Sequence, residues 1–185
     1  MEIKTTGIDG LLEVYPKIYH DDRGLFLEVF TPALQEQLGM SLTFVQDNLS
    51  FSKKNVVRGL HLQLPPYAQA KLISVIKGSV LDVAVDLRKN SATFGKSFSV
   101  VLDDTKHNML LIPEGFAHGF AALSDSYFFY KCSAPYHAKS EKGVIWNDPT
   151  LNINWGINSP VVSQKDLQLP TLEEFIRNSV ISPKD

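Results

Sequence analysis

The middle of this chain alternates apolar residues with polar or small ones, and no other feature constrains the fold as strongly. A period of two residues is the side-chain period of a β-strand, because successive side chains point to opposite faces of a sheet. The stretch from Val80 to Arg88 therefore predicts a strand with one buried face. Its two faces are Leu81, Val83, Val85 and Leu87 on one side, and Asp82, Ala84, Asp86 and Arg88 on the other.

Shorter apolar runs, separated by Gly, Pro, Asn and Asp, predict further strands. These runs cover residues 25–30, 72–76, 98–102, 109–112 and 127–132. Many short strands at regular spacing are typical of a double-sheet jelly roll or barrel. We therefore expect an all-β, jelly-roll fold.

Two stretches predict short helices on the outside of this barrel. The first covers residues 32–38, where Thr31 is a suitable N-cap and Pro32 occupies the first helical position. The second covers residues 171–178. The tail from Asn147 onward is rich in Asn, Pro and Ser, and we expect it to form ordered loops across the barrel.

Length and charge limit the classes of function. A chain of 185 residues suits one domain, which we expect to span residues 1–185. A net charge of -2 argues against a nucleic-acid or anionic-membrane partner, because it provides no basic surface field. The single Cys132 excludes an internal disulfide and fits a reducing compartment. With no apolar stretch long enough for a signal peptide or membrane span, we expect a cytoplasmic location.

Two segments carry candidate chemistry: VVRGLHLQ from Val56, followed by Lys71 and Gly78, and IPEGFAHGF from Ile112. They resemble the metal-binding segments of cupins, which supply a His-x-His pair, a Glu seven residues before a Gly, and a further His after a Pro-x-Gly turn. Those four positions here are His61, Gln63, Lys71 and His118. A charged Lys has no lone pair and repels a divalent cation, so we expect neither a metal nor another cofactor. A His, a cation, tyrosines and a carboxylate instead suit proton transfer beside a carbonyl.

Each of these residues also has an ordinary structural interpretation. His61 could be a satisfied core or surface histidine, and His118 could simply cap a glycine-rich turn. Lys71 shares a strand face with Ile73 and Val75, so its ammonium would be desolvated there and would need an anionic partner. Alternatively, Lys71 could lie on an edge strand and extend to solvent. Tyrosines in apolar strands, such as Tyr130, usually belong to a core.

Taken together, the motifs closely resemble the dTDP-4-dehydrorhamnose 3,5-epimerase family of sugar-nucleotide enzymes, which has a cupin-like fold. The likeness covers most of the chain in the same order, so it is far more specific than any single motif. The matching segments are DDRGLFLEVF from Asp21, QDNLS from Gln46, VVRGLHLQLPPYAQAKL from Val56, LDVAVDLRKNSATFG from Leu81, IPEGFAHGF from Ile112, FYKCSAPY from Phe129, VIWNDP from Val144 and SQKD ending at Asp166. The segment DDTKHNMLL at residues 103–111 departs from the family in its polar start, which leaves only a strand boundary open.

The resemblance implies inversion of the two carbons beside the C4 ketone of dTDP-4-keto-6-deoxyglucose. Each inversion needs a base, a stabilised enolate and an acid on the opposite face. By position, His61 is similar to the family's base, and Asp166 to the carboxylate that orients it. Tyr130 corresponds to the acid, and Lys71 would face the C4 oxygen.

The resemblance also implies a nucleotide site and a homodimer. The residues that would bind the dTDP-sugar are Arg23, Phe26, Glu28, Gln46, Asp47, Asn48, Arg58, Gln63, Lys71, His118, Tyr136, Glu141 and Lys165. Among these, Arg23, Arg58 and Lys165 resemble phosphate or sugar contacts, and Tyr136 resembles the residue that stacks on thymine. Family members exchange N-terminal strands within dimers, so Arg23, Phe26 and Glu28 are expected to serve the neighbouring site.

Three other functions stay open. One is an epimerase that inverts a single carbon, or a ketoisomerase, on the same nucleotide sugar. Another is a sugar-nucleotide-binding cupin without catalysis, against which His61, Lys71, Tyr130 and Asp166 argue together. The last is a metal-dependent cupin, which Gln63 and Lys71 disfavour. The sequence leaves open the number of carbons inverted, the pathway and the breadth of nucleotides accepted.

Overall fold

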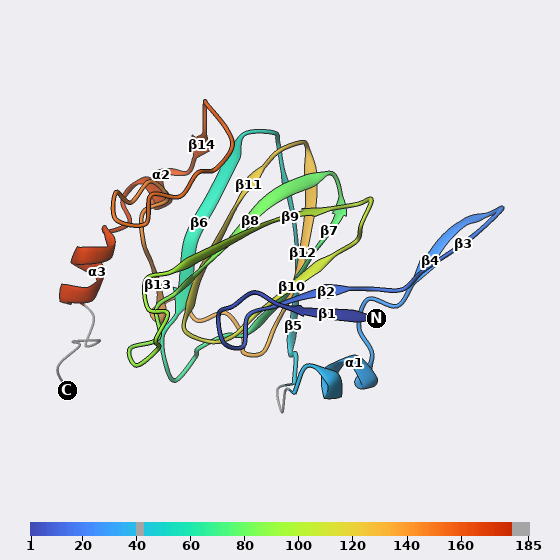
Figure 1. Cartoon of the computed structure of the whole chain (residues 1–185). Helices are drawn as coiled ribbons and strands as arrows, with labels where there is room; N and C mark the ends of the chain where they lie inside the picture. The colour runs from blue at the N-terminus through green and yellow to red at the C-terminus, as the bar shows by residue number, and fades with distance from the viewer. Residues whose placement is uncertain (40–42, 179–185) are drawn as a thin grey trace.

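The computed structural model describes residues 1–39 and 43–178, and strands dominate the described part of the chain. Two six-stranded sheets face one another, with a separate two-stranded hairpin beside them (Figure 1). The first sheet has the order β1-β2-β10-β7-β12-β5, and the second has β13-β6-β11-β8-β9, with β14 pairing in parallel with β6. This arrangement confirms the all-β jelly roll expected from the alternating pattern.

The strands and helices have the following bounds. The first sheet contains β1 (Glu2–Thr5), β2 (Leu12–Tyr15), β10 (Met109–Ile112), β7 (Lys71–Lys77), β12 (Ser126–Cys132) and β5 (Gln46–Ser52). The second contains β13 (Glu141–Gly143), β6 (Val56–Gln63), β11 (Phe116–Ala122), β8 (Ser79–Asp86), β9 (Ser97–Asp103) and β14 (Val161–Val162). The hairpin joins β3 (Ile18–Asp21) to β4 (Gly24–Leu27), and the helices are α1 (Pro32–Gln37), α2 (Gln164–Leu167) and α3 (Leu172–Asn178).

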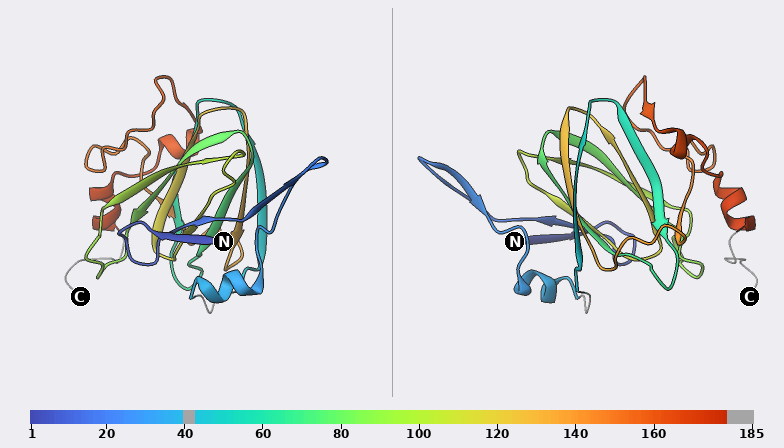
Figure 2. Two further views of the ribbon diagram at one scale, coloured as in Figure 1. Left: turned by 45° about the vertical axis from the view of Figure 1, so that its right-hand side comes forward. Right: turned by 180° about the vertical axis from the view of Figure 1, so that it is seen from behind.

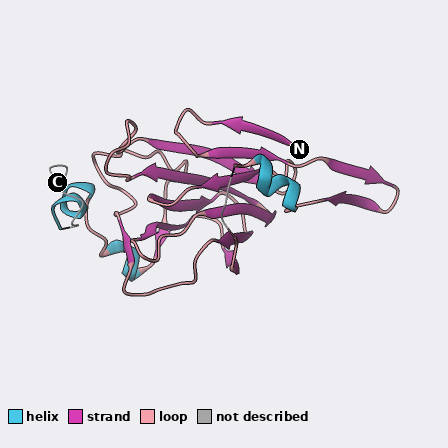
Figure 3. Ribbon diagram, turned by 90° about the horizontal axis from the view of Figure 1, so that it is seen from below, coloured by secondary structure: helices cyan, strands magenta, loops and turns pink. Residues whose placement is uncertain are grey.

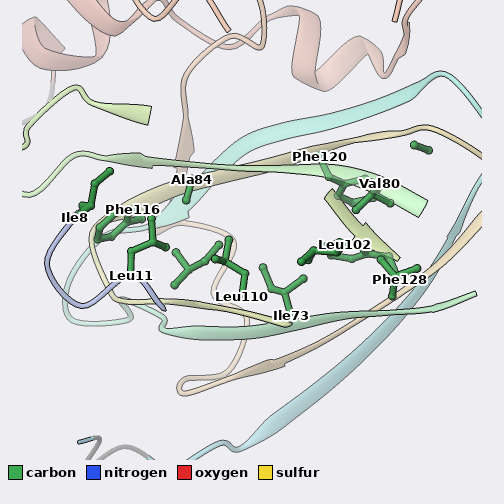
Figure 4. Close-up of a cluster of buried hydrophobic side chains, with 13 residues drawn as sticks. Ile8, Leu11, Ile73, Val80, Ala84, Leu102, Leu110, Phe116, Phe120 and Phe128 are labelled. Carbon is green, nitrogen blue, oxygen red and sulfur yellow. The ribbon is translucent and has the colours of Figure 1, made fainter. Parts of the chain in front are cut away.

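Apolar side chains from both sheets meet inside the barrel (Figure 4). Ile73 and Leu110 come from the first sheet, whereas Ala84 and Phe120 come from the second. Phe120 and Phe128 stack with their ring centroids 4.1 Å apart, which ties the two sheets together. This cluster fills one part of the interior and leaves the remainder to polar side chains.

The expectation that residues 80–88 form a half-buried strand is wrong, because both faces of β8 are covered. Val83 and Val85, on the outer face, belong to the same buried cluster as Trp155 and Phe175 of the C-terminal segment. The opposite face, which carries Asp82, points into the barrel. The polar residues of this strand are therefore interior residues, and the C-terminal segment covers the face that would otherwise meet solvent (Figure 2).

The two helices expected from the sequence are present. Thr31 caps α1 by accepting a hydrogen bond at Oγ1 from the Leu34 N–H over 3.1 Å. The second expected helix is α3, which packs Leu172 and Phe175 onto the barrel. Short elements with few apolar residues, such as β13 and α2, were not expected. None of the helices in residues 1–39 and 43–178 is long and apolar enough to cross a membrane.

The hairpin of β3 and β4 projects away from the barrel (Figure 3). Its large side chains Tyr19, Leu25 and Phe26 are about half exposed or more, and Phe26 is 64% exposed. The apolar run at residues 25–30 contains a strand only as far as Leu27. The large apolar side chains of this projecting arm are therefore exposed and do not enter the core of their own chain.

Candidate functional site

A polar cavity of about 320 Å³ lies between the two sheets and below α2. A second hollow of about 160 Å³ shares His61, Lys71 and Tyr130 with it, so the two are neighbouring parts of one cleft. The residues that line the larger cavity are Ser50, Arg58, His61, Lys71, His118, Gly119, Phe120, Phe128, Tyr130, Ser163, Lys165 and Asp166. The smaller hollow is completed by Gln46, Asn48, Leu62, Gln63, Gln69, Cys132, Tyr136 and Glu141.

His61 and Asp166 form a hydrogen-bonded pair at one wall of this cavity. The two residues are 105 positions apart, and Nε2 of His61 lies 2.7 Å from Oδ1 of Asp166. Asp166 also accepts a hydrogen bond from the Gly59 N–H, and its own N–H donates to Oγ of Ser163, the N-cap of α2. This buried carboxylate, held by the Gly59 N–H and by the start of α2, fixes the imidazole ring and leaves Nδ1 of His61 for a ligand.

The electrostatics of Asp166 favour its charged form. Burial acts to raise the pKa of this carboxyl, but the hydrogen bond and charge of His61, with the Gly59 N–H and Ser163, outweigh burial and lower the pKa below its usual value. Asp166 is therefore an anion at neutral pH. Its charge stabilises an imidazolium on His61, so His61 can accept a proton within the cavity.

Glycine allows β6 and β11 to approach closely behind His61. Gly59 has a φ of 121°, and a Cβ at this position would lie 2.6 Å from the Gly119 Cα. A Cβ on Gly119 would likewise lie 2.5 Å from the Arg58 carbonyl oxygen. This contact sets the depth at which His61 and the N–H of Gly59 face Asp166.

Lys71 and Tyr130 face His61 from the opposite sheet. Lys71 is on β7 and Tyr130 on the adjacent strand β12, whereas His61 is on β6. Burial lowers the pKa of Lys71, partly offset by the negative groups Asp82 and Glu141 and by Cys132. Burial raises the pKa of the Tyr130 phenol, so this group stays protonated at neutral pH. A substrate between the sheets would therefore meet a base on one side, and a cation and an acid on the other.

His118 belongs to a second histidine–aspartate pair. It lies beside His61 in the β6–β11 register, and its Nε2 is 2.9 Å from Oδ2 of Asp82. Asp82 is fully buried, and its Oδ1 has no hydrogen-bond partner among the described residues. Burial lowers the pKa of His118, and the charges of Lys71 and His61 lower it further, against the opposing effect of Asp82.

Glu141, Tyr136 and Lys165 form a polar cluster at the outer end of the cleft. Oε2 of Glu141 accepts hydrogen bonds from the Tyr136 hydroxyl and from Nζ of Lys165. Burial acts to raise the pKa of Glu141, but these two donors outweigh it and lower the pKa. The exposed Tyr136 ring and the Lys165 ammonium are thereby held at the entrance, where a flat base and a phosphate could bind.

The structure brings most, but not all, of the sequence-predicted binding strand to the cleft. Gln46 and Asn48 line the smaller hollow, and Nε2 of Gln46 donates to Oδ1 of Asn48 over 2.9 Å. Asp47 lies on the other face of β5, where it pairs with Lys131 at 2.9 Å. The period of two separates Asp47 from its neighbours, so the structure does not place it at the cleft. Arg58 lines the larger cavity, anchored by a hydrogen bond from Nε to the Ser52 hydroxyl.

Gln63 occupies one position of a cupin metal ligand, but its side chain is already engaged. Its Nε2 donates to the carbonyls of Tyr67 and Pro135, and its Oε1 accepts from the His137 N–H. Within residues 1–39 and 43–178, no group of three or more His, Cys, Asp or Glu side chains could hold a metal ion. The amide of Gln63 thus fastens loops beside the cleft, although the residue also contributes to its wall.

The three predicted N-terminal contacts lie outside this cleft. Arg23 is at the tip of the projecting hairpin, where it pairs with Asp21, and Phe26 is on the same arm. Glu28 lines a separate hollow beside α1, together with Tyr19 and Leu34. Within one chain, these residues do not reach His61.

Sequence reasoning missed Asp82, Ser50 and Ser163 as wall or supporting residues of the site. Asp82 had a visible signal, since it lies in the polar face of the alternating stretch, but that face was assigned to solvent. Ser163 precedes α2 as an N-cap, although a helix of four residues leaves little periodicity to detect. Ser50 follows the same alternation as Gln46 and Asn48.

Comparison with known proteins gives one consistent result. A family model described as dTDP-4-dehydrorhamnose 3,5-epimerase matches residues 5–174. The dTDP-4-dehydrorhamnose 3,5-epimerase of Escherichia coli strain K12 is 46% identical over 185 residues, which cover 98% of this chain and 100% of the relative.

Solved structures are similar over nearly the whole chain. A dTDP-6-deoxy-D-glucose-3,5-epimerase from Legionella pneumophila, in complex with dTDP-4-keto-L-rhamnose, has 45% identity and a TM-score of 0.89, covering 93% of each chain. A 3'-monoepimerase from Streptomyces bikiniensis, in complex with dTDP-quinovose, has 32% identity and a TM-score of 0.88, covering 92% of this chain and 88% of that chain.

Proposed function

This chain belongs to the dTDP-4-dehydrorhamnose 3,5-epimerase family, and we propose that it converts dTDP-4-dehydro-6-deoxy-D-glucose into dTDP-4-dehydro-L-rhamnose. The reaction inverts C3 and C5, the two carbons beside the C4 ketone. A hydrogen next to a ketone is acidic enough for a positioned base to remove, and the resulting enolate can be reprotonated on its other face. The chemical requirements are thus a base, an acid and a charge for the enolate oxygen.

His61 is the base in this proposal. Its Nε2–H donates to Asp166, so Nδ1 has the lone pair that takes the proton from C3 or C5. The imidazolium that forms is stabilised by the Asp166 carboxylate, which is held in its charged form. Asp166 acts through His61 and does not itself contact the substrate.

Lys71 stabilises the enolate. Among the described residues, its ammonium has no hydrogen-bond or ion-pair partner within 4.0 Å, although Asp82 and Glu141 act on it electrostatically. A partly buried cation without a protein partner is suited to an oxygen that becomes negative during the reaction. This group supplies the charge that a metal ion supplies elsewhere, so the proposed mechanism needs no metal or other cofactor.

Tyr130 is the acid that returns a proton to the enolate. It lies on the sheet opposite His61, which is the geometry that inversion requires. Its raised pKa keeps the proton on the phenol until the enolate is present. After one inversion, rotation of the sugar in the cleft would present the second carbon to the same two groups.

The remainder of the substrate occupies the outer cleft. Arg58 and Lys165 supply positive charge for the diphosphate, and the exposed ring of Tyr136 provides a surface for the thymine. Gln46 and Asn48 present amide groups on the same side. These assignments follow from the charges and shapes of the groups at the entrance.

The observation that carries the proposal is the His61–Asp166 pair facing Tyr130 and Lys71 across one cavity. The test is to incubate chelator-treated protein with dTDP-4-dehydro-6-deoxyglucose in heavy water, and to follow deuterium at C3 and C5 by proton NMR and mass spectrometry. Label at both carbons, with a product that a dTDP-4-dehydrorhamnose reductase accepts, supports the double epimerase. Absence of exchange at either carbon would contradict it.

Inversion of C3 alone is the second candidate. It is favoured by the similarity to a 3'-monoepimerase, which has the same fold at a TM-score of 0.88. Tyr130 does not separate the two candidates, because inversion of one carbon needs the same acid on the opposite face as inversion of two. In the same experiment, deuterium at C3 with none at C5 would select the single epimerase.

We also propose that the protein is a cytoplasmic homodimer in which each hairpin of β3 and β4 serves its partner. The exposed hairpin residues Tyr19 and Phe26 support this assembly, as do Leu49 and Phe51 on the outer face of β5. A buried, unpaired Cys132 is consistent with a reducing compartment. The proposed domain spans residues 1–185, of which 40–42 and 179–185 lie outside the described residues.

A further inference from the structure

The cavity contains two histidine–aspartate pairs, and the proposed reaction uses only one of them. His61 and His118 are directly paired in the β6–β11 register, and each directs Nε2 at a carboxylate. His61 is 26% exposed at its side chain, whereas His118 is 9% exposed and its partner Asp82 is fully buried. The second pair therefore lies deeper in the cavity. The family resemblance implies that His118 binds the dTDP-sugar, but it assigns neither the group that His118 contacts nor a role for Asp82.

Hydrogen bonding at Asp82 fixes which nitrogen of His118 holds the proton. A carboxylate only accepts hydrogen bonds, so a neutral imidazole 2.9 Å away must donate from Nε2. Nδ1 of His118 then has a free lone pair. Among residues 1–39 and 43–178, no group donates a hydrogen bond to this nitrogen, and the ring lines the cavity.

Electrostatics keep His118 neutral while His61 changes its charge. Burial disfavours an imidazolium at His118, and the positive charges of Lys71 and of a protonated His61 disfavour it further. Asp82 opposes these effects, but the pKa of His118 still lies below its usual value. His118 is therefore poorly suited to be a second base and well suited to be a neutral acceptor.

A neutral acceptor in this cavity requires a donor from the substrate. On the proposed substrate, the sugar ring has two hydroxyl groups, at C2 and C3, whereas the C4 oxygen can only accept. Lys71 supplies the donor for that oxygen from the opposite sheet. Nδ1 of His118 is matched to a hydroxyl and mismatched to a carbonyl, because two acceptors cannot form a hydrogen bond.

We propose that Asp82 is a positioning residue that locks His118 as its Nε2–H tautomer, so that Nδ1 accepts a hydrogen bond from a hydroxyl of the substrate's sugar ring. This inference rests on the proposed function for the identity of the sugar. It assigns to the second pair a role in orienting the ring, separate from proton transfer at C3 and C5. Removal of the hydroxyl and removal of the acceptor should then abolish the same hydrogen bond, so their effects on the reaction should not add.

The tautomer is measured first, by nitrogen-15 NMR of protein labelled at its histidines, with His118 assigned by its absence from the His118→Phe variant. Wild-type protein should show His118 with a protonated Nε2 and an unprotonated Nδ1. In Asp82→Asn, the amide group can donate to Nε2, so the Nδ1–H tautomer should become populated. A protonated Nδ1 in the wild type, or an unchanged spectrum in Asp82→Asn, would overturn the proposal. This measurement needs no catalysis, so it remains decisive if the epimerase activity is not found.

The hydroxyl is tested with 2-deoxy and 3-deoxy forms of the substrate, using deuterium exchange at C5 as the common readout. One of the two analogues should lower kcat/KM of the wild type by about tenfold, a typical effect of one lost hydrogen bond. The same analogue should lower kcat/KM of His118→Phe by less than about twofold, because that variant has already lost the acceptor. Equal losses in wild type and variant for both analogues would contradict the assignment.

Asp86→Asn is the matched control. Asp86 is on the same strand and is also fully buried, but it binds Arg88, Ser91 and Thr93 outside the cavity. This variant should lose stability and yet keep the His118 tautomer and the full discrimination against the deoxy analogue. Titration with dTDP checks folding of all variants, and its affinity should change little in Asp82→Asn. Loss of discrimination in Asp86→Asn would show that general loosening of β8 explains the effect.

Discussion

At the scale of residues, the two histidines of the cleft differ in surroundings more than in geometry. Each has a carboxylate at Nε2, yet His61 is partly exposed beside α2 and His118 is buried beside Lys71. The same side chain is thus suited to gain a proton at one position and to remain neutral at the other. Roles for such residues have to be assigned from burial and neighbouring charge, and each can be tested by substitution.

Substitution of His61 should separate catalysis from binding. We expect His61→Ala to lower kcat by about a hundredfold to ten-thousandfold, the typical contribution of a general base, with little change in the affinity for dTDP. Turnover is measured by proton NMR and binding by calorimetry. Normal turnover in this variant would mean that another residue removes the proton.

Tyr130→Phe should affect the return of the proton more than its removal. The variant keeps His61 as the base, so the substrate should still exchange its hydrogen with solvent although little product forms. The two rates are compared in heavy water by mass spectrometry of recovered substrate and product. An equal fall in both rates would contradict the assignment of Tyr130 as the acid.

The lowered pKa of Lys71 predicts a loss of activity at high pH. The charged ammonium is the functional form, and burial moves its pKa below the usual 10.5, so activity should fall as pH rises through this lowered value. Lys71→Arg, whose guanidinium keeps its proton, should have lower activity but no such basic limb. Profiles of kcat/KM against pH check this, and a basic limb that persists in Lys71→Arg would assign it to another group.

At the scale of elements, the site depends on the close contact between β6 and β11. Four consecutive residues of β6 supply three parts of the site. Arg58 and His61 line the cavity, and the Gly59 N–H donates to Asp166. The strand can hold them at this depth only where neither Gly59 nor Gly119 has a side chain. Two glycines thus give β6 its position against β11.

Gly59→Ala should damage both stability and catalysis. An added Cβ would meet the Gly119 backbone at 2.6 Å, and Gly59 has a φ of 121°, so the free energy of unfolding should fall by more than about 2 kcal/mol. Gly95→Ala is a suitable comparison, since Gly95 also has a positive φ but no atom within 4 Å of an added Cβ, and it should cost about 1 kcal/mol with activity retained. Urea denaturation and turnover are measured for both, and similar effects would show that crowding at Gly59 is unimportant.

At the scale of the whole molecule, some of the residues expected to bind the substrate lie on the projecting hairpin, away from the cleft of the barrel. Arg23 and Phe26 lie on an arm that leaves the barrel, and they do not line the cleft of their own chain (Figure 1). The proposed homodimer would return them to a cleft on the neighbouring chain. This exchange can be tested by complementation.

A mixture of two inactive variants should regain activity if Arg23 serves the partner's cleft. His61→Ala lacks the base, and Arg23→Ala lacks the phosphate contact, but a mixed dimer would contain one complete site. After denaturation and joint refolding, about a quarter of wild-type activity per chain is expected, because half of the dimers are mixed and each has one intact site. Refolding each variant alone is the control, and a mixture no more active than the average of the two would place Arg23 in its own chain's site.

The local sequence determined most of the strands, because alternation is short-range information, whereas the reacting groups were nominated by the resemblance to a family over most of the chain. Alternation predicts strands from the sequence alone, and the N-cap Thr31 with Pro32 fixes the start of α1. The order of motifs along the chain was sufficient to nominate His61, Lys71, Tyr130 and Asp166, which the structure brings to one cavity.

Only the tertiary structure decided which face of each strand meets the cleft and which distant residues pair. The polar face of β8 points inward because a C-terminal segment covers its apolar face, and this covering cannot be seen within the strand itself. Asp82 and His118 are 36 residues apart, and Asp47 leaves the cleft because register places it on the outer face of β5. Periodicity gives the alternation of two faces, but the packing of sheets and loops decides which face is the interior.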